Sequence, residues 1–148
     1  MACPACGFEP STVTPPDAIA ALRSYPRRSR ELIPPDEEPD PVVLDSAGRA
    51  ATIIDALGAD LEAILVTDDA SLTTDASLAT SAAPSGDRLT ALDRLTAATT
   101  RVADLAGRQP AAAWSRTGLR PSGPVTAGDL LREAVHAGIH NLRIAQKF

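Results

Sequence analysis

Two pairs of side chains in this sequence have the types and the spacing that suit metal binding. Cys3 and Cys6 lie near the N-terminus with two residues between them, and His136 and His140 lie four residues apart near the C-terminus. They are the only two cysteines and the only two histidines in the chain. Thiolate sulfur and imidazole nitrogen are the ligands that structural zinc prefers, and four of them complete a tetrahedral site. The count therefore predicts a zinc site shared by the two ends of the chain.

The cysteine pair taken alone has three interpretations. In the first, Cys3-Pro-Ala-Cys6-Gly7 is half of a zinc site, and Gly7 adopts a positive φ that turns a backbone N–H towards a sulfur. In the second it is a redox dithiol, although the strand–helix–strand context of a thioredoxin-like motif is absent. In the third the thiols are unrelated. The zinc half-site is favoured, and the missing ligands must then come from His, Asp or Glu.

The histidine pair is predicted to lie on one long helix over residues 126–146. Thr126 followed by Asp129 is the pattern of a capping box at a helix N-terminus. Apolar residues then recur at helical spacing: Leu131, Val135, Gly138, Ile139 and Leu142. His136 and His140 stack on one side of such a helix and point away from the apolar stripe. The alternative to metal binding is that both imidazoles are solvated on a polar face.

Three further helices are predicted over residues 16–32, 41–66 and 86–106, with a long loop over 67–86. The chain is 44% hydrophobic but only 3% aromatic, which favours helices packed through alanine and leucine over a sheet sandwich. The predicted fold class is all-α, a four-helix up-down bundle with a long crossover. We expect one domain, residues 1–148, made of a leader (residues 1–14) and the bundle (15–148).

Composition and net charge limit the binding partners and the cellular compartment that we expect for this protein. The 148 residues carry a net charge of −5 with a pI of about 4.9, so nucleic acid is not an expected partner. No apolar run reaches the roughly 20 residues that cross a bilayer, and no signal peptide is evident. We therefore expect a cytoplasmic protein in which the thiols are reduced or bind metal. Lys147 is the only lysine among 14 basic residues, a bias typical of high-GC bacterial genomes.

Three segments of the sequence resemble one known family. They are Ala-Gly-Arg-Ala-Ala at residues 47–51, Trp-Ser-Arg at 114–116, and Val-His-Ala-Gly-Ile-His-Asn-Leu at 135–142. This pattern is similar to the DinB-like superfamily, which includes mycothiol-dependent isomerases and bacterial thiol S-transferases. The resemblance covers roughly residues 16–148, in the same helix order, and rests mainly on the last helix and the Ala-Gly-x-Ala position.

The resemblance implies a bundle that carries a divalent metal on three histidines, two of which would fall on His136 and His140. The third would fall on Arg49 in the second helix, where this sequence departs from the family. Arginine stays protonated and has no lone pair to give to a metal. The leader is also an addition, and Cys3 and Cys6 would compensate for the missing ligand at an outer cleft between the second and fourth helices.

Two functions follow as hypotheses. The first is a metal-dependent transferase or isomerase that acts on a small molecule with mycothiol or a related thiol, through zinc or another divalent metal. Arg49 would then bind a carboxylate, unless it is a surface residue paired with an acid, and Trp114 would stack on a ligand, unless it only covers one end of the bundle. The second is a non-catalytic binding or accessory protein with structural zinc. Four protein ligands favour the second, and three with a water favour the first. A homodimer is compatible with either.

Overall fold

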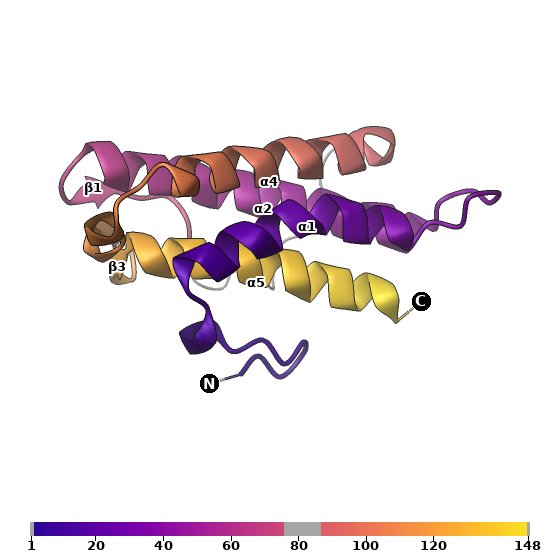
Figure 1. Ribbon diagram of the computed structural model, residues 1–148, viewed down its shortest axis with the longest axis horizontal. Coiled ribbons are helices and arrows are strands. Elements are labelled where there is room, and N and C mark those ends of the chain that lie inside the picture. Colours follow the sequence, from indigo (N-terminus) through magenta and orange to yellow (C-terminus); the bar gives the residue numbers. More distant parts are fainter. Residues whose placement is uncertain (1, 76–86, 148) are drawn as a thin grey trace.

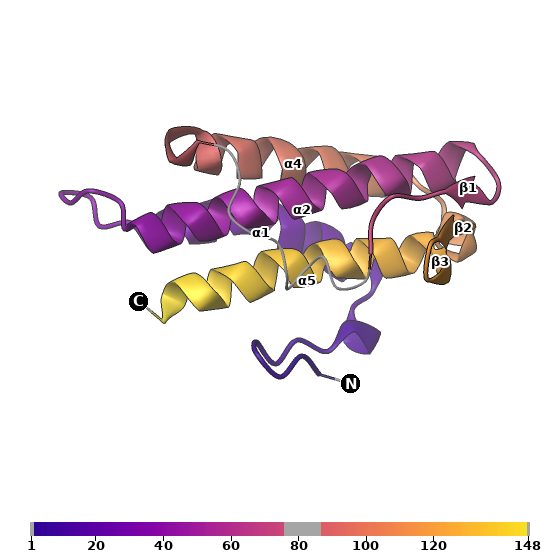
Figure 2. The same cartoon turned by 180° about the vertical axis from the view of Figure 1, so that it is seen from behind.

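The computed structural model describes residues 2–75 and 87–147. Within them, four long helices form a bundle (Figures 1 and 2). Their bounds are α1 (Pro15–Glu31), α2 (Pro41–Val66), α4 (Ala91–Gly107) and α5 (Ala127–Gln146). Three short 3-10 segments accompany them: η1 (Pro10–Thr12), η2 (Arg88–Thr90) and η3 (Ala111–Ser115). The four predicted helices are confirmed. The third was expected from residue 86, which lies outside the described residues, and its α-helix begins only at Ala91.

Local sequence accounts for where the helices begin. Thr14 with Asp17 and Thr126 with Asp129 each form a complete capping box, which satisfies backbone N–H groups that have no partner inside the helix. α1 then continues through Pro26 to Glu31. The capping box at Thr126 fixes the first turn of α5, and with it the rotational positions of the two histidines further along.

The long crossover between α2 and α4 makes those two helices parallel. Arg88 in η2, just before α4, pairs with Asp45 near the start of α2, and Arg101 in α4 pairs with Glu62 near the end of α2. The two helices therefore run in the same direction. α1 and α2 each pack against both α4 and α5. The order is therefore up-down-down-up, with α1 diagonally opposite α2 and α4 diagonally opposite α5.

A small sheet at one end of the bundle corrects the all-α prediction. It consists of β1 (Ala70–Ser71), β2 (Thr117–Arg120) and β3 (Gly123–Thr126), with β1 parallel to β2 and β2 antiparallel to β3. The strands are too short to show an alternating hydrophobic pattern. A Cβ on Gly118 would lie 2.8 Å from Ile64 Cγ1, so this strand packs against the end of α2 at backbone distance.

A buried polar network fastens the sheet to the helices. Asp60 of α2 accepts hydrogen bonds from the backbone N–H groups of Thr73 and Thr74, at 3.2 and 2.8 Å. Thr74 Oγ1 accepts one from Arg120 at 3.1 Å, and Arg120 forms a bidentate ion pair with Glu133 of α5. Buried charges are stable only when paired and hydrogen-bonded in this way.

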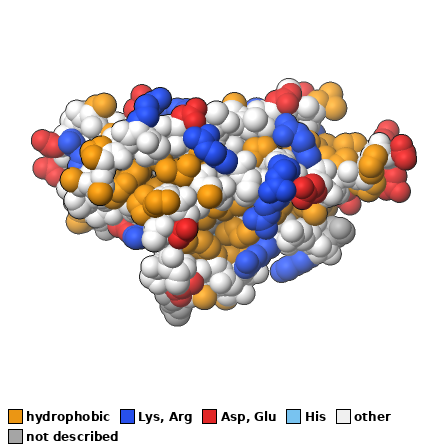
Figure 3. Space-filling view, in the orientation of Figure 1, with side chains coloured by type: hydrophobic (Ala, Val, Ile, Leu, Met, Phe, Trp, Pro, Cys, Tyr) orange, Lys and Arg blue, Asp and Glu red, His pale blue; other side chains and the backbone are white. Residues whose placement is uncertain are grey.

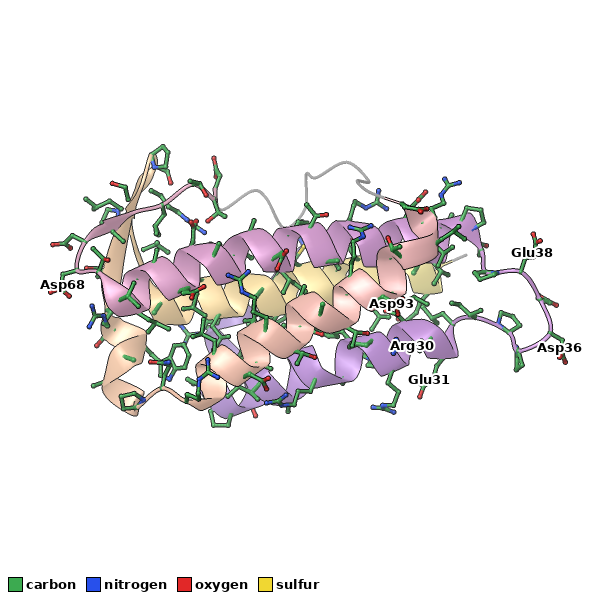
Figure 4. All side chains as sticks on the ribbon, turned by 90° about the horizontal axis from the view of Figure 1, so that it is seen from above. Arg30, Glu31, Asp36, Glu38, Asp68 and Asp93 are labelled. Carbon is green, nitrogen blue, oxygen red and sulfur yellow. The ribbon has the colours of Figure 1, made fainter. Side chains whose placement is uncertain are left out.

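Charge is distributed unevenly over the surface. Asp36 and Glu38 project from the loop at one end of the bundle, and Asp68 lies at the other end (Figure 4). On the face shown in Figure 3, basic side chains gather over α1 and the C-terminal half of α5. No helix among the described residues has the length and apolar character to cross a membrane.

Candidate metal centre

The leader folds back along the outside of α5 (Figures 1 and 2). A tight loop around the cysteines is closed by two backbone hydrogen bonds, from Cys3 N–H to Phe8 O at 2.8 Å and from Gly7 N–H to Cys3 O at 2.7 Å. Gly7 has the predicted positive φ, +75°. Its own N–H is bonded to the Cys3 carbonyl oxygen, and the backbone of the next residue, Phe8, forms a hydrogen bond with the Cys6 sulfur.

Other backbone N–H groups surround the two sulfurs. Burial raises the pKa of the Cys3 thiol, but hydrogen bonds from the backbone of Cys6 and Ala5 outweigh it, and the net pKa is lowered. Burial dominates at Cys6 and raises the pKa of its thiol, although the backbone of Phe8 and the charge of Arg143 act in the opposite direction. Hydrogen bonds of this kind stabilise a thiolate, the form of cysteine that binds metal.

α5 brings both imidazoles beneath the leader. The Phe8 ring stacks on His136 with centroids 5.1 Å apart and an interplanar angle of 17°. His136 meets His140 edge to face at 5.6 Å, and only 6% of His140 is exposed. The alternative of two solvated histidines is therefore wrong.

The surroundings of both imidazoles lower their pKa and so favour the neutral form. Burial lowers the pKa of His136, and the neighbouring His140 lowers it further. Burial also lowers the pKa of His140, with added repulsion from the charges of Lys147 and Arg49. A neutral imidazole has a free lone pair, which is what a metal ligand requires.

The four predicted ligands converge at one place. One donor atom from each of Cys3, Cys6, His136 and His140 lies within 4.8 Å of all the others, and Cys3 Sγ lies 3.8 Å from His140 Nδ1. Bond lengths of about 2.0–2.3 Å in a tetrahedral zinc site correspond to donor separations of roughly 3.3–3.8 Å. His136 Nε2 is buried without a hydrogen-bond partner, a costly state that a metal ion would relieve. The donor set fits a metal such as zinc.

Arg49 borders this cluster, as its position in the second helix predicted. Its Nε donates to Asn141 Oδ1 at 3.3 Å, and its charge contributes to the lowered pKa of His140. Among the described residues no carboxylate forms an ion pair with Arg49, and nearby Asp45 pairs with Arg88. The alternative of an acid-paired surface arginine is not what the structure shows, while a role in substrate binding stays a prediction.

Trp114 lies on η3, apart from the four donors. It packs against the core and lines a hollow of about 320 Å³ with Val13, Pro15 and Leu131. In this position Trp114 covers one end of the bundle, which is the alternative to a ligand-stacking role. The predicted ligand-stacking role of Trp114 stays a prediction.

A second hollow, of about 350 Å³, adjoins the candidate site. Pro10 of the leader, Arg120 of β2 and Glu133 of α5 form parts of its wall, and His136 lines it as well. Arg132 lies between the two hollows, and its Nε donates to Val13 O at 3.1 Å. The leader therefore walls both hollows.

Three residues around the cluster were given no role of their own by the sequence analysis. They are Phe8, which covers His136, Asn141, which holds Arg49, and Arg143, whose Nη1 would lie 3.3 Å from a Cβ on Gly7. Their neighbours in space are distant in the sequence, so their roles depend on the leader's path.

Comparison with known proteins tests the fold. No family model matches this sequence, and no curated protein matches it. A solved structure does match, that of YfiT from Bacillus subtilis, described as a probable metal-dependent hydrolase with an unusual four-helix bundle topology. The two chains share a fold. The TM-score is 0.72 over 95% of this chain and 90% of YfiT, with 13% sequence identity. At that identity the similarity supports the four-helix architecture and carries no activity across.

Proposed function

We propose that this chain is a zinc-binding protein of DinB-like type in which Cys3, Cys6, His136 and His140 hold a structural ion. The observation that carries the proposal is the convergence of four soft donors from the two ends of the chain within 4.8 Å. Four protein ligands leave no position for water or substrate, which is typical of structural zinc. We therefore favour a binding or accessory role over catalysis.

In this proposal the chain's own residues do most of the positioning. The N–H groups around Cys3 and Cys6 hold the thiolates, and the Phe8 ring fixes the plane of His136 by stacking. The zinc ion, when bound, supplies the link between the leader and α5. The leader would then be held as a wall of the hollow beside His136.

Metal analysis and melting test the proposal. Protein purified without added metal should contain one zinc per chain, and chelation should lower the melting temperature while far-ultraviolet circular dichroism keeps its helical signal. Cys3→Ser and His140→Ala should each lose the metal, whereas Arg23→Gln, which alters an exposed pair with Asp104, should retain it. Stoichiometric zinc and unchanged stability in a Cys3→Ser/Cys6→Ser variant would show that the leader is not part of the site.

A second candidate function is a metal-dependent enzyme acting on a small molecule, with mycothiol or a related thiol as cosubstrate. It is favoured by the 350 Å³ hollow beside His136, a size usual for small-molecule sites, and by the description of YfiT as a probable metal-dependent hydrolase. Arg49 would bind a carboxylate of the substrate or cosubstrate. X-ray absorption spectroscopy of the zinc protein separates the two, because an open site would show an oxygen ligand in place of a sulfur.

A further inference from the structure

The two thiols of the proposed site lie close enough to react with each other. The sulfurs of Cys3 and Cys6 belong to the cluster whose donor atoms all lie within 4.8 Å of one another. A disulfide needs Cβ atoms about 3.5–4.5 Å apart and a sulfur–sulfur bond of about 2.05 Å. The two sulfurs lie within 4.8 Å of each other on one tight loop, so they must approach by at most about 2.8 Å to form the bond.

The two thiols differ in their access to solvent. Cys6 is 7% exposed and faces the bundle, whereas Cys3 is half-buried. Oxidation of cysteine follows thiolate character and exposure, and a buried partner nearby commonly completes the disulfide. A small oxidant therefore reaches Cys3 first, with Cys6 in place as the resolving thiol.

We propose that Cys3 and Cys6 are a peroxide-sensitive dithiol whose oxidation to a disulfide removes two metal ligands and unfastens the leader from α5. This inference rests on the proposed function, because the leader can be unfastened in this way only if the thiolates hold a metal.

The chemistry balances with hydrogen peroxide or an organic hydroperoxide as the oxidant. Cys3 Sγ attacks a peroxide oxygen, the O–O bond breaks, and Cys3 becomes a sulfenic acid as hydroxide (or alkoxide) leaves. Cys6 Sγ then attacks Cys3 Sγ, the S–O bond breaks and a second hydroxide leaves. The two sulfurs lose two electrons to the peroxide, and two protons from solvent neutralise the two leaving groups. The metal keeps its charge throughout.

Loss of both thiolates would leave only weaker contacts to hold the leader. Two imidazoles complete only half of a tetrahedral zinc site. The contacts that remain include the stack of Phe8 on His136, the hydrogen bond from Arg132 to the Val13 carbonyl, and the packing of Phe8 and Val13 against the core. Because Pro10 walls the hollow beside His136, release of the leader would also open that hollow.

The experiment uses the full chain loaded with one zinc per chain and titrated with hydrogen peroxide. We expect the intact mass to fall by two hydrogens, two free thiols to disappear, and one zinc to be released to a chromogenic chelator. Treatment with a dithiol reductant and zinc should reverse all three changes. Leader release is followed by brief chymotrypsin digestion after Phe8, because the leader contains no lysine or arginine. Cleavage should rise to the rate of the chelated, unoxidised protein. A Cys3→Ser/Cys6→Ser variant, cleavable from the outset, should show no response beyond oxidation of Met1.

The outcomes separate this inference from the proposed function. Absence of bound zinc before peroxide is added would refute the proposed function, whatever the thiols then do. Bound zinc that survives a large excess of peroxide with both thiols intact would overturn the inference and leave the structural site standing. So would a disulfide that forms between two chains, or one that forms while zinc and the leader stay in place.

Discussion

Gly138 lies between the two histidines and gives the sharpest test of how α5 packs. A Cβ at Gly138 would lie 2.1 Å from Cε2 and 2.3 Å from Cδ2 of Tyr25. The Tyr25 ring is 2% exposed, and its hydroxyl donates to the Val135 carbonyl at 2.8 Å. The adjoining cavity is only about 10 Å³. The ring therefore has no space to move into, and Gly138→Ala should destabilise the bundle.

The expected change in the free energy of unfolding of Gly138→Ala combines two costs and one gain. Carbon atoms pack at about 3.5 Å or more, so ring and helix must separate by roughly 1.4 Å. Overpacking of this kind costs about 1–3 kcal/mol, and loss of the Tyr25 hydrogen bond adds about 1 kcal/mol. Alanine in place of glycine inside a helix returns about 1 kcal/mol. We expect Gly138→Ala to lower the free energy of unfolding by about 1–3 kcal/mol, or about 3–10 °C in melting temperature.

Urea unfolding followed by circular dichroism measures this change, with Gly107→Ala as the matched control. Gly107 ends α4 and a Cβ there would meet nothing within 4 Å, so this variant should be more stable by about 0.4–1 kcal/mol. Zinc content should be unchanged in Gly138→Ala, because the histidines two residues to either side point away from Tyr25 at about 100° per residue. Equal or higher stability of Gly138→Ala would refute the packing argument, and Tyr25→Leu in the same chain should recover part of the loss.

Three more predictions test other parts of the molecule. Glu133→Gln removes the ion-pair partner of Arg120, whose side chain is 4% exposed, and leaves only the weaker attraction of Asp60 and Asp75. The change should cost about 3 kcal/mol in urea unfolding, whereas Glu62→Gln, at an exposed pair with Arg101, should cost under about 1 kcal/mol. Burial raises the pKa of Tyr25, the only tyrosine, well above its usual value, so absorbance at 295 nm should stay flat until the protein unfolds. The contribution of Tyr25 to the free energy of unfolding should be complete below about pH 10 and fall at higher pH, where the phenol of the unfolded chain ionises. Ionisation of Tyr25 near pH 10 in the folded protein would contradict the raised pKa. In the Cys3→Ser/Cys6→Ser background, Arg49→His should restore metal binding with three imidazoles, measured by metal content after dialysis, and no recovery would argue against that placement of Arg49.

The sequence predicted the helices because their signals are local. Thr126 and Asp129 mark the start of α5, and an apolar stripe follows at helical spacing. The four donors could be predicted by count, since the chain has no other cysteine or histidine. The short strands could not, because β1 and β2 depend on packing against α2 and on the Asp60 network. The cover provided by Phe8 and the bond between Arg49 and Asn141 also join distant residues, which no periodicity reveals.

The energetics of the leader explain why the metal and the thiols matter together. Residues 2–13 precede α1 and contain only the short η1. Ordering a dozen residues costs at least about 1 kcal/mol each, or roughly 12 kcal/mol in all. The leader's hydrogen bonds return about 1 kcal/mol apiece, and packing of Phe8 and Val13 against the core adds to them. These contacts and the ordering cost are therefore of similar size. Structural zinc in small peptides contributes about 10–16 kcal/mol, more than the difference between them. A bound metal would therefore fix the path of the leader along α5, and oxidation of Cys3 and Cys6 would withdraw its largest single contribution.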